Sequence, residues 1–326
     1  MSTQVSKAEA VERPAAAACV SVVIPAYNAA AHLAQCLESV RVQRGDFTLD
    51  TLVIDDGSRD DTVAIARGQA GVRVITQANR GPSAARNAGI AATTGEFIAF
   101  LDADDLWPVG KLDAQLDVLT RHPDVALVFG DCRQFDAAGS FTRTEFESGG
   151  FGAASWGPGP IVPRAYARLL ANNFITTGSV VVRRSALLAA GGFAEDLRLV
   201  EDLDLWLRIA HGRPIAWCGH ECLQRRRHEH NTSRDAEAIG LAFLEVLRRH
   251  RQALQSGDAA EPGIDMRQLV SREYLHLAEL AMCKRSLGVA WQRVWHALCG
   301  DLRPANQLHV AKAAAKLVAS SLGWRG

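Results

Sequence analysis

The residues that most clearly suggest chemistry are three crowded carboxylates, Asp102, Asp104 and Asp105. They follow residues 95–99, whose apolar composition predicts a buried strand. Asp102 and Asp104 have strand spacing, so both side chains can project to one side. Such acids repel one another unless a cation or hydrogen-bond donors compensate them. The pattern therefore predicts a Mg²⁺ or Mn²⁺ site completed by substrate phosphates. From these residues alone, a solvated turn or helix cap is the alternative.

Two earlier strand ends carry polar groups of the same kind. Residues 52–54 form an apolar run that breaks into Asp55 and Asp56, a glycine turn and a Ser/Asp helix start. Residues 20–25 form a first strand, which ends in Tyr27 and Asn28. Ligands of open α/β sheets gather outside the carboxyl ends of the strands. We therefore expect all three strand ends to line one crevice.

The elements that position these groups are strands separated by helices. Apolar spacing predicts helices over residues 30–43 and 61–69, between the three strands. This alternation is typical of an α/β protein with a doubly wound, mostly parallel sheet flanked by helices and joined by right-handed crossovers.

Five sequence blocks, taken together, resemble family 2 of the glycosyltransferases. This is an inverting family of GT-A fold that uses nucleotide-diphosphate sugars. The blocks, in family order, are residues 20–28, 53–58, 79–89, 100–105 and 191–193 leading into 201–208. The resemblance covers residues 19–234, which it identifies as a GT-A catalytic domain. Each block is a weak signal alone, but their joint order is specific.

The resemblance implies a nucleotide-binding role for residues at the first two strand ends. Asp56 would accept a hydrogen bond from the uracil ring, and three residues would wall the nucleoside pocket: Pro25, Tyr27 and Asn28. Arg86 and Asn87 would face the nucleotide or the donor sugar.

The resemblance also implies roles for the acids after residue 100. Asp102 would hold the ribose or assist the metal, and Asp104 would ligate the Mg²⁺ or Mn²⁺ that bridges the pyrophosphate. A segment ending in Arg226, His228, Asn231 and Ser233 resembles the family's closing segment, which makes His228 the candidate third ligand. An interface histidine is the alternative, because imidazole is a less obvious ligand for Mg²⁺.

Asp202 is the candidate general base. Without the resemblance, Glu201 and Asp202 could simply cap the amphipathic helical pattern that follows, because acids in a first turn favour the helix dipole. With it, Asp202 would deprotonate the acceptor hydroxyl. One metal and one carboxylate would then give a single displacement with inversion and no covalent intermediate.

A zinc site is a competing interpretation of the residues before 231. Two cysteines and three histidines cluster there: Cys218, His220, Cys222, His228 and His230. Their spacing is not Cys-x-x-Cys and no second thiol pair follows, which argues against structural zinc.

The amino-acid composition limits the class of binding partner and indicates the redox compartment of the protein. The chain has 36 basic and 36 acidic residues, so no global field favours nucleic acid as a partner. Seven cysteines without a pairing framework indicate a reducing compartment, and we expect a cytoplasmic protein. Residues 1–18 are predicted to be a disordered tail and lack the basic start of a signal peptide. No apolar stretch has the length of about 18 residues that a membrane span needs.

Two regions have less specific signals. The Gly/Pro-rich residues 149–163 are predicted to form a loop that could cover the acceptor side. Residues 235–326 form a predicted helical C-terminal region without a catalytic motif. Its part from residue 278 has seven Lys or Arg against two acids and contains three tryptophans. These helices either pack against the catalytic domain or a dimer partner, or present an interfacial face to the inner side of the cytoplasmic membrane.

The sequence thus predicts a metal-dependent, inverting glycosyltransferase of bacterial surface polysaccharide synthesis. Its partners would be a nucleotide-diphosphate sugar, a UDP-sugar first, and a glycan or lipid-linked acceptor. A non-catalytic nucleotide-sugar-binding module is the alternative, and the presence of Asp104 and Asp202 argues against it. A phosphatase-like hydrolase would need its acid pair after the first strand, where this chain has residues 26–28.

Overall fold

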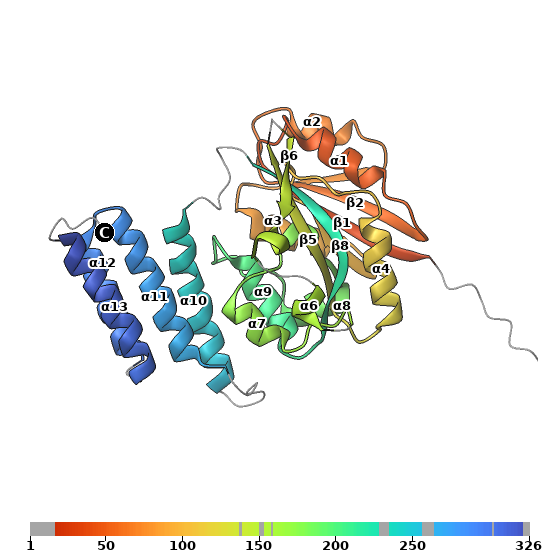
Figure 1. The fold of residues 1–326 in the computed structure, drawn as a ribbon. Helices are drawn as coiled ribbons and strands as arrows, with labels where there is room; N and C mark the ends of the chain where they lie inside the picture. Colours follow the sequence, from red (N-terminus) through yellow and green to blue (C-terminus); the bar gives the residue numbers. More distant parts are fainter. Residues whose placement is uncertain are drawn as a thin grey trace, which may run out of the picture.

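The computed structural model describes residues 17–136, 139–149, 153–157, 159–227, 235–255, 264–301 and 303–321. A central sheet has helices on both faces, and further helices lie beside it (Figure 1). The strands are β1 (Ala18–Ala26), β2 (Phe47–Asp55), β3 (Val72–Thr76), β4 (Phe97–Phe100), β5 (Leu127–Asp136), β6 (Gly139–Thr144), β7 (Val181–Arg183) and β8 (Ile215–Arg226).

The helices fall into two groups along the chain. The first group is α1 (Leu33–Arg41), α2 (Thr62–Arg67), α3 (Pro82–Ala92), α4 (Lys111–Arg121), α5 (Glu145–Gly149), α6 (Ala153–Trp156), α7 (Ala165–Ala171), the 3₁₀ turn η1 (Thr177–Ser179), α8 (Arg184–Ala190) and α9 (Glu201–Ala210). The second group is α10 (Ala236–Gln255), α11 (Met266–Cys283), α12 (Leu287–Gly300) and α13 (Pro304–Ser321).

The described strands form one mixed sheet in the order β3-β2-β1-β4-β7-β5-β6, with β8 paired to β5. The pairs β1–β2, β2–β3, β1–β4 and β5–β8 are parallel. Strand β7 runs antiparallel to β4 and β5, and β6 runs antiparallel to β5. The predicted α/β fold with a mostly parallel sheet is confirmed. The antiparallel strand at its centre was not indicated by the sequence pattern.

Alternate residues of the sheet supply two separate cores. On β4, Ile98 and Phe100 belong to a cluster with helices α3, α7 and α9. Phe97 and Ala99 belong to the opposite cluster, with helices α1 and α4. A strand buried on both faces appears in the sequence as a continuous apolar run, which is what predicted β4.

Helix α3, which carries Arg86 and Asn87, is fixed closely against β1. A Cβ at Gly89 would lie 2.3 Å from Cγ1 of Val23, so only glycine permits this approach. Pro82 occupies the first helical position, where a missing backbone N–H costs nothing. The position of α3 relative to the strand ends therefore follows from its own sequence.

The prediction of a loop over residues 149–163 is wrong for residues 153–156, which form helix α6, whereas residues 159–163 belong to no helix or strand. Helix α6 lies within this stretch, and Trp156 is only 1% exposed. Its ring packs against Phe174, with the ring centroids 4.8 Å apart, and against Phe129 at 5.9 Å. This aromatic contact anchors the segment in the core, so its described part is not an open cover.

The C-terminal helices divide into an inner and an outer pair. Val246 and Leu247 of α10 are fully buried in the core that contains α7 and α9, and Leu269 of α11 packs against the same core. Helices α11, α12 and α13 share a third cluster, and α12 and α13 lie farthest from the sheet (Figure 1). Among the described residues, no helix has the length and apolar character that would span a bilayer.

Candidate active site

The ends of β1, β2 and β4 meet at one edge of the sheet. Ala26 of β1 pairs with Asp55 of β2, and Val23 of β1 pairs with Phe100 of β4. The three strands are parallel, so the residues that follow them share this edge. The structure therefore brings together the polar residues after the three strands: Tyr27, Asn28, Asp56, Asp102 and Asp104.

The loop after β1 is tied to the loop after β2. Asn28 adopts a left-handed conformation with φ of 49°, which asparagine tolerates better than most residues. Its Oδ1 accepts a hydrogen bond of 2.9 Å from the N–H of Arg59, and its own N–H donates to Ser58 Oγ at 2.9 Å. Pro25 is partly buried in β1, whereas Tyr27 is 52% exposed. The tyrosine ring is thus the accessible surface of this loop.

Asp56 is buried and already holds three donors of the chain. Its Oδ1 accepts from Gln77 Nε2 at 2.7 Å and from the N–H of Arg80 at 2.9 Å. Its Oδ2 accepts from the N–H of Gly81 at 2.8 Å. Asp56 therefore fixes the loop that leads into α3, and its role in binding uracil stays a prediction.

The acidic loop after β4 is held by the end of β8. Asp105 is 3% exposed, and its Oδ1 accepts from the N–H of Arg226 at 2.8 Å. Burial, followed by the charges of Asp104 and Asp102, raises the pKa of Asp105 well above its ordinary value. Nε of Arg226 also donates to the backbone oxygen of Asp104 at 2.9 Å. Three acids thus share one loop, and a backbone N–H of β8 compensates the buried one.

The donor set at this edge fits a hard divalent cation shared with a substrate. Such an ion needs only one or two protein carboxylates when phosphates complete its coordination. The side chain of Asp102 is 40% exposed, and Asp104 is partly exposed. Within the described ranges no three His, Cys, Asp or Glu residues form a cage of their own. His228, the other predicted ligand, lies outside the described residues.

The described residues also contain no zinc site of the kind considered from the sequence. Cys218 Sγ lies 3.3 Å from Cys222 Sγ. No third metal-binding side chain joins them in the described part of the chain. All seven cysteines are free thiols.

Arg86 lies between two carboxylates, buried beneath the edge rather than open to it. It is 5% exposed, with Nη2 donating to Asp102 Oδ1 at 2.7 Å and Nη1 donating to Glu201 Oε1 at 2.9 Å. The guanidinium lies over the ring of Phe193, 5.3 Å from its centroid. One side chain therefore joins the acids after β4 to the first turn of α9.

Asn87, the neighbour of Arg86, is bonded to the backbone of Phe193. Its Nδ2 donates to the carbonyl of Phe193 at 2.9 Å, and its Oδ1 accepts from the N–H of Phe193 at 2.8 Å. The preceding Gly192 has φ of 73°, and a Cβ there would lie 2.6 Å from Asn87 Oδ1. Only glycine suits this position, which explains the Gly-Gly-Phe block in the sequence. The predicted contact of Asn87 with the donor stays a prediction.

Asp202 is partly buried in the first turn of α9 and is oriented by three donors. Its Oδ1 accepts from the N–H of Leu203 at 2.7 Å, with Asn173 Nδ2 more distant at 3.5 Å, and its Oδ2 accepts from Thr177 Oγ1 at 3.2 Å. Burial, and then the charge of Glu201, raises the pKa of Asp202 to about 7. A carboxyl with this pKa can exchange a proton near neutral pH. The sequence analysis did not single out Asn173 or Thr177.

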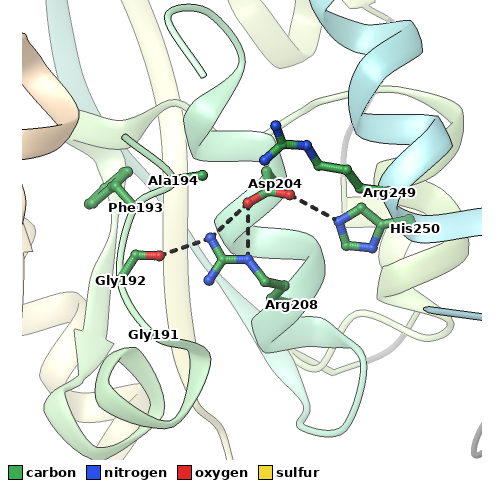
Figure 2. Close-up of a pocket in the computed structure, with 8 residues that line it drawn as sticks. All are labelled: Gly191, Gly192, Phe193, Ala194, Asp204, Arg208, Arg249 and His250. Atoms are coloured by element: carbon green, nitrogen blue, oxygen red, sulfur yellow. Dashed lines mark hydrogen bonds and ion pairs between the residues drawn. The ribbon is translucent and has the colours of Figure 1, made fainter. Parts of the chain in front are cut away.

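A cavity of about 350 Å³ lies beside the face of α9 that carries Asp204 and Arg208 (Figure 2). Asp204 and Asp202 are two residues apart on the helix, about 200° around its axis. Arg208 donates to Asp204 Oδ2 at 2.7 Å and to the carbonyl of Gly192 at 2.8 Å. Nε2 of His250, from α10, lies 3.4 Å from Asp204 Oδ1. The cavity thus lies between α10 and the loop of residues 191–194. Asn87 is hydrogen-bonded to the same loop at Phe193.

Comparison with known proteins identifies related sequences. Residues 21–189 match the sequence model of the family described as glycosyl transferase family 2. Chondroitin synthase of Escherichia coli is 28% identical over 66% of this chain and 30% of its own length. An uncharacterized glycosyltransferase of Rickettsia felis is 30% identical over 60% of this chain and 31% of its own length. The chain therefore spans about a third of the length of these curated relatives.

Comparison of folds gives solved structures with similar architecture. Crystal structures of Staphylococcus aureus TarS 1–349 match 92% of this chain, with a TM-score of 0.59 at 19% identity, and of 0.60 at 18% identity for the complex with UDP-GlcNAc. They are covered over 88% and 81% of their lengths, respectively. The mannosyltransferase PcManGT of Pyrobaculum calidifontis, in complex with GDP-Man and Mn²⁺, matches 94% of this chain and 86% of its own, with a TM-score of 0.53 at 22% identity.

Proposed function

The chain belongs to glycosyl transferase family 2 and is a glycosyltransferase. We propose that it transfers the sugar of a nucleotide-diphosphate sugar with inversion of configuration at the anomeric carbon. The sugar passes to a hydroxyl of a glycan or lipid-linked acceptor. The observation that carries the proposal is the position of Arg86, which contacts Asp102 at 2.7 Å and Glu201 at 2.9 Å. Asp102, a predicted donor-site acid, and Glu201, the neighbour of the predicted base Asp202, therefore lie on either side of one guanidinium.

Donor binding is proposed for the shared strand edge. Pro25, Tyr27, Asn28 and Asp56 bind the nucleoside, and Asn87 borders the donor sugar. UDP is the first nucleotide to test, because the TarS structure contains UDP-GlcNAc, while PcManGT makes GDP the second.

Asp104 is proposed as the ligand of a Mg²⁺ or Mn²⁺ ion, with Asp102 assisting and His228 as a further ligand. When bound, the ion neutralises the charge that develops on the departing nucleoside diphosphate. The Mn²⁺ in the PcManGT complex supports a divalent metal.

Proton removal is proposed for Asp202. The acceptor hydroxyl attacks the anomeric carbon while its proton passes to the Asp202 carboxylate, and the bond to the leaving diphosphate oxygen breaks on the opposite face. Leu203 N–H and Thr177 Oγ1 orient the carboxylate for this step. A pKa of about 7 lets the group be ionised before attack and still accept the proton. No covalent intermediate is required.

The biological setting is proposed from the same resemblance. Synthesis of a bacterial surface polysaccharide at the inner face of the cytoplasmic membrane suits a lipid-linked acceptor. Trp291 and Trp295 of α12 lie one helical turn apart and are 41% and 62% exposed. Helices α12 and α13 contain no acidic residue, which favours an anionic lipid surface. A homodimer through these helices is the alternative.

A thermal-shift screen of UDP-, GDP- and dTDP-sugars with and without Mn²⁺ tests donor class and metal together. A ligand at about 100 times its dissociation constant stabilises the folded state by about 2.7 kcal/mol, which is readily measured. The proposal predicts one nucleotide class that raises the melting temperature with Mn²⁺ and much less with excess chelator. If no nucleotide sugar stabilises the chain, the donor-site assignment is wrong. If one does but no acceptor is ever glycosylated, the non-catalytic binding module becomes the better explanation.

A further inference from the structure

The backbone immediately before Asp202 is strained. Val200 has φ of 54° and ψ of 23°, in the left-handed region. For a β-branched side chain this conformation is a genuine outlier, which persists only where surrounding contacts hold it. Val200 is the residue before α9, and its carbonyl accepts the first helical hydrogen bond, from the N–H of Asp204. The direction in which α9 leaves this turn, and with it the position of Asp202, depends on keeping Val200 strained.

The surrounding contacts show what holds the turn. Glu201 follows Val200 directly, and its side chain is 14% exposed in an ion pair with Arg86, whose side chain is 6% exposed. Arg86 cannot follow Glu201 away from the site, because its other arm is bonded to Asp102 and α3 is packed onto β1 at Gly89. A buried, doubly bonded guanidinium is a rigid anchor, since its planar fork loses little further freedom.

From this geometry we infer that Arg86 is a positioning residue: through Glu201 it holds the strained Val200 turn, and thereby aims Asp202 at the donor site. The inference rests on the proposed function and adds a role for Arg86, Glu201 and Val200 within it. Arg86 also donates to Asp102, so one side chain fixes the position of Asp202 relative to this donor-site acid. Asp202 itself touches the acceptor, whereas Arg86 acts through Glu201.

Two substitutions distinguish the positioning role of Glu201 from a direct effect of its charge on Asp202. Glu201→Gln keeps the size of the side chain and leaves the bond between Arg86 and Asp102 in place, but weakens the anchor of the turn. Val200→Gly removes the cost of the left-handed conformation, because glycine adopts it freely. The double variant should therefore keep the turn in place without the ion pair. Glu221→Gln is the matched control, since Glu221 forms an ion pair of 2.7 Å with Arg133 elsewhere in the sheet.

The experiment measures kcat, affinity for UDP with Mn²⁺ by calorimetry, and hydrogen exchange of residues 198–204 by mass spectrometry. Rates are taken at about pH 8.5, where Asp202 is ionised in every variant. We expect Glu201→Gln to lower kcat by about tenfold, a misplacement effect. UDP affinity should stay within about twofold, and exchange should become faster at 198–204. The double variant should recover most of both losses, and Glu221→Gln should match wild type.

Two results would overturn the inference. One is unchanged kcat and exchange in Glu201→Gln. The other is a loss that Val200→Gly does not recover, which would mean that Glu201 acts by its charge or through another contact. If wild type transfers no sugar, the proposed function fails, but the exchange measurement still decides whether Arg86 and Glu201 hold the turn.

Discussion

The raised pKa of Asp202 makes a prediction about stability that needs no substrate. The folded state holds the pKa of this carboxyl at about 7 through burial and the charge of Glu201, against an ordinary value of 3.8. The folded state therefore binds more protons than the unfolded state between these values, so folding becomes less favourable as the pH rises from about 4 to about 7. Above pH 7 the whole cost of the buried charge is present.

Asp202→Asn removes that cost. A pKa difference of about three at about 1.4 kcal/mol each gives about 4 kcal/mol as the upper bound. Loss of one of the hydrogen bonds from Leu203 and Thr177 returns about 1 kcal/mol. We therefore expect the variant to be about 3 kcal/mol more stable than wild type at about pH 8.5, and slightly less stable at about pH 4.

Urea unfolding followed by tryptophan fluorescence, repeated across this pH range, measures the difference. Asp117→Asn is the control, because Asp117 is half exposed beside Arg121 and its replacement should shift stability by no more than about 0.5 kcal/mol at any pH. Equal stability of Asp202→Asn and wild type at every pH, or a less stable variant at high pH, would refute the assignment of a destabilised buried carboxylate.

Three further outcomes are expected. Asp104→Asn should abolish transfer and weaken Mn²⁺-dependent binding of UDP in calorimetry while the protein stays folded; full activity in this variant or in excess chelator would remove Asp104 from the metal site. The rate of transfer should rise with pH as Asp202 ionises near pH 7, and a flat profile from about pH 5 to 9 would argue against a base with that pKa. Replacing both Trp291 and Trp295 by alanine should lower co-sedimentation with anionic vesicles without altering UDP binding; unchanged sedimentation, or a change of oligomeric state instead, would favour the dimer.

Local patterns were sufficient to predict the strand edge. The runs that became β1, β2 and β4 are apolar because both faces of the sheet are covered, and each ends in polar residues. The predicted strand over 20–25 is within β1, and the predicted helix over 61–69 contains α2. Such signals lie within a few residues of one another, so they are visible without knowledge of the fold.

Long-range contacts were not visible in the same way. Arg86 pairs with Glu201, 115 residues away, and nothing in the local sequence of either residue indicates the partner. The resemblance placed Arg86 against the nucleotide, whereas the structure bonds its side chain to two carboxylates of the chain. Strand β8 continues to Arg226 through polar residues and through register shifts against β5, and neither feature has a strand signal in the sequence. Val200 was overlooked because backbone strain leaves no mark in composition.

The most direct test of the proposed function compares wild type and Asp202→Asn for donor binding and sugar transfer on the same preparation. Asparagine keeps the shape of the side chain but cannot accept the proton, so calorimetric titration with the donor and Mn²⁺ should give nearly the same affinity for both. Transfer should fall by about 10²-fold or more, the scale of lost general-base catalysis. Undiminished transfer by Asp202→Asn would contradict the account and leave Asp202 as an acid that only begins a helix.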